Sequence, residues 1–556
     1  MKNIIIILSL ICLLFAIPTK GQSQMELYVE CQSLQNFIAG DGYLWGNIKY
    51  EENSKWIGGE PFTFRDSPII RASMPVRNSF INRIRGRGKY GFKGVSVPRQ
   101  PRRYFPECRV RITVDEDCPH FTIVSGVLFN RDKTILVAYL AEKVEYVVPS
   151  SITTIGDFAF SNSDISNIVL PSNLATIGNY AFRGCRNLTH INIPYSVINI
   201  GDRAFSGSGL TVFEIPSTIS TISNGMLSNT NLSSIEIPEN IVAIGASAFA
   251  NNPQLSYVSI PNSVKHIGAN AFRNSGLTSF AIPSTISTIS AGMLSYTNLL
   301  SIEIPENIVT IGAFAFANNS YLSYASIPNS VERIGLAAFR NSGLVSFTIP
   351  TAMDTINPET FSGTRLSSIE IPENIVSIGR SAFVNNPYLR YVSIPRSVRY
   401  IGAFAFGNCT NLVSINFPDG MNDSIIIKEN AFFNTPWLDS IVNNREGNAV
   451  YIGTVLYKYK WESSNKTEII YVREGTRSIV SRAFYRTHHN PRFIHMRYTP
   501  HIPHSIVIPN SVWYIGKDAM NIHNLKRLYV NWTSLDSLKI NVAFRPIMSG
   551  VIGEAK

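Results

Sequence analysis

The fold is decided by the stretch Leu255-Ser-Tyr-Val-Ser-Ile260-Pro-Asn-Ser-Val264-Lys-His-Ile267-Gly268-Ala-Asn-Ala-Phe272. Close variants of this stretch recur along the chain, and the Pro that follows Ile260 has counterparts about every 22 residues from Pro149 to Pro418. So many copies at one spacing indicate an array of short repeats rather than a series of globular domains.

Each position of the repeat has a physical role. The pattern L-x-x-I-x-I places its last two apolar residues on one side of a short strand. The Pro ends that strand because it has no N–H to donate to a neighbour. One repeat cannot bury its apolar side alone, so stacked repeats must share a core. We predict an α/β repeat solenoid with one short parallel strand per turn of about 22 to 23 residues, and with short helical or 3-10 turns at the Ala-Phe segments on its convex side.

The repeats also show a longer period, which spans three of them. Pro216, Pro283 and Pro350 are 67 residues apart, and the two Pro positions that follow each of them keep the same spacing. The first repeat of each block departs from the pattern, for example with Met293-Leu294 in the place of Ala-Phe. These shared features indicate that three repeats were duplicated together as a block.

The array resembles the BspA-type leucine-rich repeat proteins, which are secreted or surface-exposed proteins of bacteria and of some parasitic protists. The resemblance is close from about Phe121 to Phe432, and the pattern resumes around Ile470 and Ile508. The segment from Ile123 to Val137 is also similar to the hairpin insert of that family. The resemblance implies a leucine-rich repeat fold and a role in adhesion to host or neighbouring cells.

The amino-terminal residues indicate export. An apolar run at 4–17 follows Lys2 and is succeeded by polar residues, which is typical of a secretory signal peptide. The run is shorter than the roughly 20 residues of a membrane-spanning helix. We therefore expect a secreted or cell-surface protein whose mature chain has no membrane span. The expected segments are a signal peptide at 1–24, a basic region or cap of unknown fold at 25–120, the repeat solenoid at 121–435, and variant repeats with a carboxyl-terminal cap at 436–556.

Charge is unevenly distributed along the chain, which carries a formal net charge of +11. The repeats are nearly neutral, whereas residues 71–111 are strongly basic. This basic stretch either is a loosely ordered, solvated segment or contacts an anionic surface or polymer. Aromatic residues are interleaved with the basic ones, as in many nucleic-acid-binding segments, but the expected export argues against a nucleic-acid partner. The arginines that would make an anionic contact are Arg83, Arg85, Arg87, Arg102 and Arg103.

No catalytic motif is recognisable, so we expect a non-enzyme that needs no cofactor. The His-rich segment at 488–504 lacks the accompanying ligands of a metal site and is interpreted as a loop between repeats. Cys108 and Cys118 either form a disulfide bond or are free thiols. Cys185 and Cys409 occupy the same repeat position and are predicted to be small, buried core residues.

The third and fifth positions of L-x-x-I-x-I should face solvent. They form rows of tyrosine, glutamate and serine side chains, which either bind a ligand or were merely copied by duplication. The candidate ligand-binding residues are Tyr257, Tyr324, Tyr391, Glu236, Glu303, Glu370, Ser259, Ser326 and Ser393.

Two functional hypotheses follow. In the first, the strand face binds a protein or glycan ligand. Such a ligand could belong to the host extracellular matrix or to neighbouring cells. In the alternative, the protein is an envelope-associated structural protein whose basic flanks bind anionic polymers, and the repeats act as a spacer. Salt distinguishes them, because binding through exposed basic residues weakens as ionic strength rises.

Overall fold

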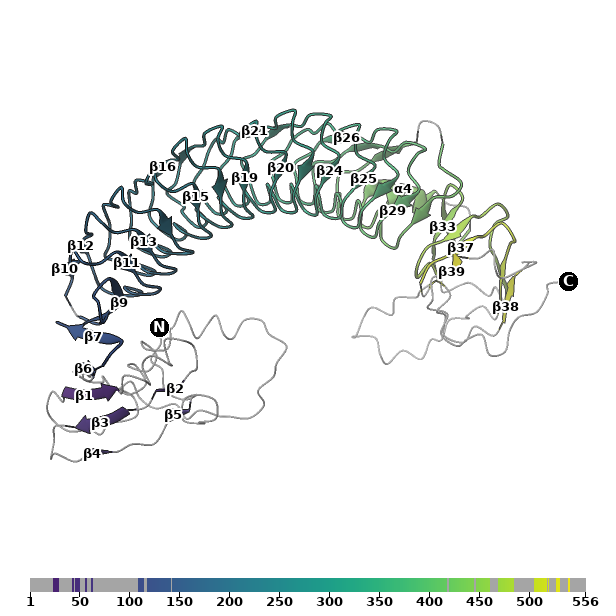
Figure 1. Ribbon diagram of the computed structural model, residues 1–556. Helices are drawn as coiled ribbons and strands as arrows, with labels where there is room; N and C mark the ends of the chain where they lie inside the picture. Colours follow the sequence, from purple (N-terminus) through teal and green to yellow (C-terminus); the bar gives the residue numbers. More distant parts are fainter. Residues whose placement is uncertain are drawn as a thin grey trace. The chain divides into compact units, whose positions relative to one another are not determined.

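The computed structural model shows a β-solenoid of stacked short strands (Figure 1). The chain divides into two compact units, residues 1–219 and 220–556. The structure describes residues 24–29, 43–44, 46–50, 56–57, 62–63, 109–114, 118–141, 143–417, 420–444, 447–460, 469–484, 505–517, 519, 527–530 and 539–540. The predicted signal peptide lies outside these residues except for Gln24, and so do the five arginines of the basic stretch.

The first unit begins with a small sheet in the segment for which the sequence predicted no fold. Its strand order is β4-β3-β1-β6, in which β1 pairs antiparallel with β3 and parallel with β6. A separate antiparallel pair is formed by β2 and β5. The bounds are β1 (Gln24–Val29), β2 (Tyr43–Leu44), β3 (Gly46–Tyr50), β4 (Trp56–Ile57), β5 (Phe62–Thr63) and β6 (Arg109–Val114).

The repeats of the first unit follow an antiparallel hairpin, as the sequence of residues 123–137 predicted. The hairpin strand β8 pairs with β9, and β9 begins a parallel ladder through β11, β13 and β14. A second parallel pair joins β10 to β12. The bounds are β7 (Phe121–Val124), β8 (Val127–Asn130), β9 (Ile135–Tyr139), β10 (Glu145–Val147), β11 (Thr154–Ile155), β12 (Asn167–Val169), β13 (Thr176–Ile177) and β14 (Asn199–Ile200).

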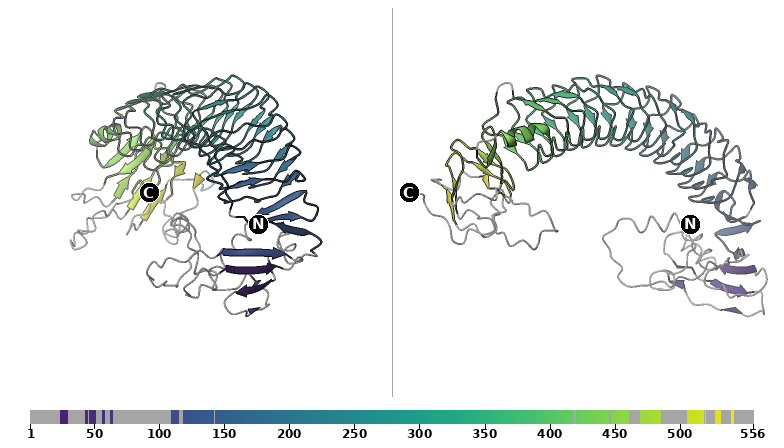
Figure 2. Two further views of the ribbon diagram at one scale, coloured as in Figure 1. Left: turned by 90° about the vertical axis from the view of Figure 1, so that its left-hand side faces the viewer. Right: turned by 180° about the vertical axis from the view of Figure 1, so that it is seen from behind.

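In the second unit, many repeats contain two short strands, whereas the sequence predicted one. The three-residue first strands lie in L-x-x-I-x-I, and their bounds are β16 (Ser234–Glu236), β18 (Tyr257–Ser259), β21 (Ser301–Glu303), β23 (Tyr324–Ser326), β26 (Ser368–Glu370), β28 (Tyr391–Ser393) and β30 (Ser414–Asn416). The second strands precede the Gly position, and their bounds are β15 (Thr221–Ile222), β17 (Ala243–Ile244), β19 (His266–Ile267), β20 (Thr288–Ile289), β22 (Thr310–Ile311), β24 (Arg333–Ile334), β25 (Thr355–Ile356), β27 (Ser377–Ile378), β29 (Tyr400–Ile401) and β31 (Ile426–Ile427). Figure 2 shows these stacked strands from two further sides.

The expected helical or 3-10 turns are not confirmed. In the Ala-Phe segment, Ala271 donates to Gly268 O within its own turn (3.3 Å), but Asn270 and Phe272 donate to the next repeat, to Ala291 O (2.9 Å) and Met293 O (3.0 Å). The reason is local, because Asn270 has a φ of 57°, and a residue in the left-handed region interrupts a right-handed helix. These segments are therefore hydrogen-bonded turns that also connect adjacent repeats.

The predicted core is present. The Phe of the Ala-Phe segment is fully buried and stacks on its counterpart in the next repeat, at 5.4 Å for Phe249 and Phe272 and at 5.3 Å for Phe316 and Phe339. Where Leu294 replaces this Phe, Phe280 of the preceding strand segment packs 5.2 Å from Phe272. In this repeat, the ring that is missing at Leu294 is thus replaced by the ring of Phe280.

The Gly that follows the second strand is required by close approach between repeats. A Cβ at Gly268 would lie 2.4 Å from Ala246 N of the preceding repeat, a distance that real Cβ atoms do not adopt. The sequence predicted that a side chain would hinder the backbone here. The structure identifies the obstacle as the backbone of the neighbouring repeat.

The second unit continues through the short helix α4 (Pro436–Asn443), whose first turn is capped by Thr435 Oγ1 accepting from Leu438 N. An antiparallel hairpin follows, and its strand β33 begins a further parallel ladder. The remaining bounds are β32 (Ala449–Ile452), β33 (Val455–Tyr459), β34 (Ile469–Tyr471), β35 (Ser478–Ile479), β36 (Ser505–Ile508), β37 (Tyr514–Ile515), β38 (Arg527–Val530) and β39 (Lys539–Ile540).

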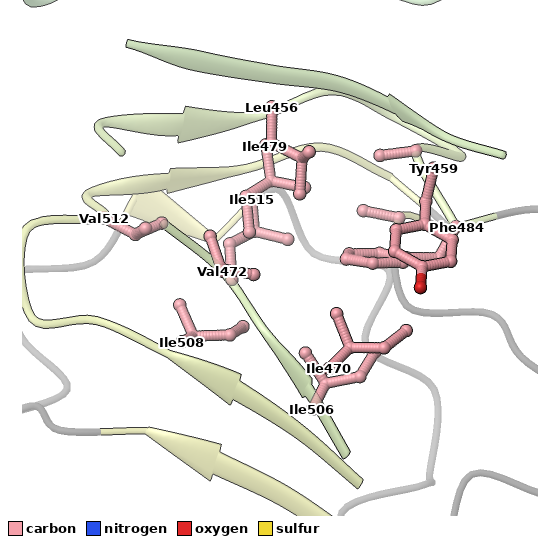
Figure 3. Close-up of a cluster of buried hydrophobic side chains, with 12 residues drawn as sticks. Leu456, Tyr459, Ile470, Val472, Ile479, Phe484, Ile506, Ile508, Val512 and Ile515 are labelled. Carbon is pink, nitrogen blue, oxygen red and sulfur yellow. The ribbon is translucent and has the colours of Figure 1, made fainter. Parts of the chain in front are cut away.

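Buried side chains hold this last part of the unit together. Ile470, Ile479, Phe484, Ile506 and Ile515 come from successive strands and turns and meet in one apolar cluster (Figure 3). Among the residues that the structure describes, no helix has the length and apolar character needed to span a membrane.

Candidate recognition surface

The first strands present two rows of side chains to solvent. In β16, Ile235 is buried, whereas Ser234 and Glu236 on either side of it are exposed. This alternation follows from the pleat of a strand, in which successive side chains point to opposite faces. The same arrangement recurs in the other first strands, so the third and fifth repeat positions form the exposed surface that the sequence predicted.

Strand pairing fixes which of these side chains are neighbours. Ser234 lies opposite Tyr257, and Glu236 lies opposite Ser259. The β21–β23 and β26–β28 pairs repeat this register with the corresponding residues. Each pair of strands therefore places a Ser beside a Tyr in one row and a Glu beside a Ser in the other.

The structure places eight of the nine candidate residues as exposed side chains. The three tyrosines are 55%, 52% and 56% exposed, in chain order. The three glutamates, Ser259 and Ser326 are also exposed, whereas Ser393 is half-buried. In the described part of the chain, the three glutamates take part in no ion pair. The arrangement offers aromatic faces and hydrogen-bonding groups on parallel strands, and binding by these residues remains a prediction.

A row of polar residues lies buried inside the solenoid. It lies three residues after the stacked Phe position, and its members in the second unit are Thr230, Asn252, Ser275, Thr297, Asn319, Ser342, Thr364, Asn386, Cys409 and Thr435. Asn319 Nδ2 donates to Leu294 O at 2.9 Å, and its Oδ1 accepts from Thr297 N at 2.6 Å. These bonds tie one repeat to the preceding one. Sequence analysis missed this buried polar row, although Thr297 and Asn319 are one repeat apart.

The prediction for Cys185 and Cys409 is confirmed, because both are fully buried free thiols. Each donates to the carbonyl of a Phe in the preceding repeat, Cys185 to Phe160 O at 3.0 Å and Cys409 to Phe383 O at 3.1 Å. Burial raises the pKa of Cys185 to about 11 and the pKa of Cys409 to about 12. These thiols are therefore poor nucleophiles and have a structural role.

Of the other predicted site residues, the structure describes only Cys118. Cys118 is buried and disulfide-bonded, and its Sγ accepts a hydrogen bond from Phe121 N at 3.3 Å. Cys108 lies outside the described residues, so its pairing with Cys118 stays a prediction. The same holds for the anionic contact expected of Arg83, Arg85, Arg87, Arg102 and Arg103, and for the His-rich segment at 488–504.

Sequence analysis also missed an exposed row beside the tyrosines. We call it the edge row; it consists of Thr278, Leu300, Ser323, Val345, Ser367, Arg390 and Val413. Each residue donates its backbone N–H to the carbonyl of the preceding member, for example Ser323 to Leu300 O (3.0 Å) and Arg390 to Ser367 O (2.9 Å). An alignment of the duplicated blocks could have revealed the edge row. Its residues differ between the blocks, whereas most core residues are the same.

The repeat pattern, the stacked Phe residues and the paired strands agree with a family comparison. The model of the BspA-type leucine-rich repeat region matches residues 141–256, 242–364, 333–454 and 389–496, which together exceed half of the chain. The chain belongs to the BspA-type leucine-rich repeat family. No match was found among curated proteins.

Several solved structures resemble this BspA-type protein. A leucine-rich cell surface protein of Faecalibacterium prausnitzii is 24% identical, with 55% of this chain and 96% of that chain covered and a TM-score of 0.43. A leucine-rich repeat protein of Bacteroides ovatus is 22% identical, with 75% and 90% covered and a TM-score of 0.38. The pneumococcal vaccine antigen PcpA is 15% identical, with 79% and 99% covered and a TM-score of 0.37.

Proposed function

We propose that this protein is a non-catalytic, secreted or cell-surface recognition protein that binds protein or glycan ligands through its first strands and so mediates adhesion. The observation that carries the proposal is the repeated placement of exposed Tyr257, Tyr324 and Tyr391 beside Ser and Glu side chains on paired strands. Tyrosine supplies a large contact area with few rotatable bonds, which limits the entropy lost on binding. Export is proposed from the signal-peptide pattern at 1–24.

The rigidity of the scaffold supports the proposal. Within one block, adjacent repeats are joined by strand pairing, by stacked Phe rings such as Phe383 and Phe406, and by hydrogen bonds of buried polar residues such as Asn386. A ligand that binds this surface therefore meets side chains already held on ordered backbone, and preorganisation of this kind reduces the free energy lost on association.

The test is binding of residues 25–556 to matrix proteins, glycans and anionic polymers at low and high salt. We expect salt-resistant binding that weakens at least about tenfold in the Tyr257→Ala/Tyr324→Ala/Tyr391→Ala variant, since exposed aromatic anchors contribute strongly to interfaces. Tyr195→Ala is the matched control, because Tyr195 is 75% exposed and lies outside the first-strand rows.

A second variant tests the alternative, in which the basic flank binds the ligand. Replacement of Arg83, Arg85, Arg87, Arg102 and Arg103 by Gln leaves the tyrosines intact. If this change or high salt abolishes binding, and the tyrosine variant binds like the unchanged protein, the basic flank is the binding element and the proposal is wrong.

A further inference from the structure

Three segments of the second unit share one fold and differ in the surface beside their tyrosines. We call them segment A (231–278), segment B (298–345) and segment C (365–413). Each contains two first strands in the same register. Their interiors are closely similar, as shown by Ile235, Ile302 and Ile369, which are 2%, 2% and 3% exposed. The inward residue beside the tyrosine changes only from Val258 and Val392 to the smaller Ala325 in segment B. The larger differences between the segments therefore lie on the surface.

Segment B presents an apolar and aromatic patch. Leu300, Tyr321, Tyr324 and Val345 are 57%, 62%, 52% and 50% exposed. Backbone hydrogen bonds join Leu300 to Ser323 and Ser323 to Val345, so these side chains come from successive turns of one ladder.

The equivalent places in segment A are polar. Ser233, Gln254 and Thr278 stand 67 residues before Leu300, Tyr321 and Val345, and Tyr257 is the member that both segments share. The solenoid therefore folds without apolar residues at these three places. Apolar residues that are grouped on neighbouring turns, as Leu300, Tyr324 and Val345 are, and that the fold does not require are typical of an interaction surface.

Segment C keeps the tyrosines and an exposed Val, with Val413 in the place of Val345, and adds positive charge. Tyr388 and Tyr391 are 57% and 56% exposed. Arg365 and Arg390 are exposed, and they stand where segment B has Asn298 and Ser323. Within the described ranges, neither guanidinium group forms an ion pair. An unpaired Arg beside exposed Tyr offers fork-like hydrogen bonds to a carboxylate together with an aromatic contact.

From this difference we infer that the ligand is a polypeptide that places an apolar or aromatic stretch on segment B and an acidic stretch on segment C. This inference rests on the proposed function and specifies its ligand. A glycan of one repeating unit presents the same chemistry along its length, and three matching segments would suit it. The chain instead presents one repeated scaffold on which Leu300 is specific to segment B and the two Arg residues are specific to segment C, and this suits a ligand whose chemistry changes along its length.

The geometry sets the spacing of such a ligand. Segments B and C are three turns apart, which is about 14 Å at the usual distance between paired strands. An extended peptide covers this distance with about four residues. The polypeptide should therefore carry its acidic residues about four positions from its apolar or aromatic ones.

The test uses a displayed library of random 16-residue peptides, screened against residues 25–556 together with a glycan array. Two variants take their residues from segment A, which the fold already accepts. Leu300→Ser/Tyr321→Gln/Val345→Thr converts segment B, and Arg365→Asn/Arg390→Ser converts segment C. Thermal unfolding of both variants should match the unchanged protein.

We expect enriched peptides to combine aromatic or aliphatic residues with acidic residues about four positions away. Their affinity should fall at least about fivefold in either variant, which corresponds to about 1 kcal/mol. Replacing the acidic residues of the peptide by Lys should abolish its preference for the unchanged protein over the segment C variant, since only the charged contact is altered.

Two outcomes would overturn the inference. The first is enrichment of peptides whose binding both variants retain. The second is glycan binding that the variants lose while no peptide is enriched. If the tyrosine variant still loses binding in either case, the strand face remains the recognition surface, and only the choice of a polypeptide fails. If the tyrosine variant keeps all binding, the proposed function itself fails.

Discussion

The interior of the second unit and the edge-row position on its surface differ in how freely their residues vary between the duplicated blocks. Phe272 and Phe339 occupy one position in two blocks, and both are fully buried. Leu300 and Ser233 also occupy one position in two blocks, and both are exposed. An interior residue must fit the repeats on both sides of it, whereas a residue on the face meets solvent. The difference teaches that the core specifies the scaffold, while the exposed edge-row position is free to diverge between blocks.

The largest effect should come from shortening an interior aromatic residue. Phe272→Ala removes a ring that stacks on Phe249 and packs at a tilt against Phe280. We expect the free energy of unfolding to fall by about 3–5 kcal/mol, because the substitution leaves a cavity. Tyr257→Ala is the matched change on the face and should alter stability by less than about 0.5 kcal/mol. Urea unfolding of both variants measures the contrast, and equal losses would contradict it.

The next effect should come from the buried polar row. Asn319→Ala removes hydrogen bonds to Leu294 O and Thr297 N and leaves both groups buried without this partner. We expect a loss of about 1–3 kcal/mol in the free energy of unfolding. Asn262→Ala, at an exposed position, serves as the control in the same urea titration. A loss no larger than that of the control would show that the buried amide does not stabilise the stack.

A smaller, pH-dependent effect should arise from the buried thiols. The pKa of Cys409 is about 12 in the folded protein against an ordinary value of 9.0. Between these values the unfolded chain loses the thiol proton and the folded chain keeps it. Stability from the neutral thiol is therefore full below pH 9 and decreases as pH rises toward 12, by about 1.4 kcal/mol per pH unit. Cys409→Ala should flatten the fall of unfolding free energy between pH 9 and 11. An unchanged slope would contradict the burial of this thiol.

The sequence predicted the parts of the fold that repeat visibly. The spacing of Ile260, Ile267 and Phe272 was sufficient to place the first strands and the core. It was not sufficient to find the second strands, because strands such as His266–Ile267 are two residues long and exist only through pairing with adjacent repeats. The predicted helical or 3-10 turn was not confirmed, because Asn270 has a positive φ and its N–H binds a carbonyl of the next repeat, a contact that a single repeat does not reveal.

The candidate surface was predictable only in part. Alternation along the strand placed Tyr257 and Glu236 on the exposed face, since it depends on local geometry. The edge row was not visible in one repeat, because Leu300 and Arg390 become members of one row only through bonds between turns. Asn319 was missed because asparagine is usually an exposed residue, and its burial is explained by partners one repeat away.

The most direct test of the account measures stability and ligand affinity together in the Tyr257→Ala/Tyr324→Ala/Tyr391→Ala variant. The ligand is the strongest salt-resistant binder of the unchanged protein. The account predicts that the free energy of unfolding stays within about 0.5 kcal/mol, since these side chains are more than half exposed. It predicts that affinity falls at least about tenfold. A variant that unfolds as before and binds as before would contradict the claim that recognition resides on the first strands.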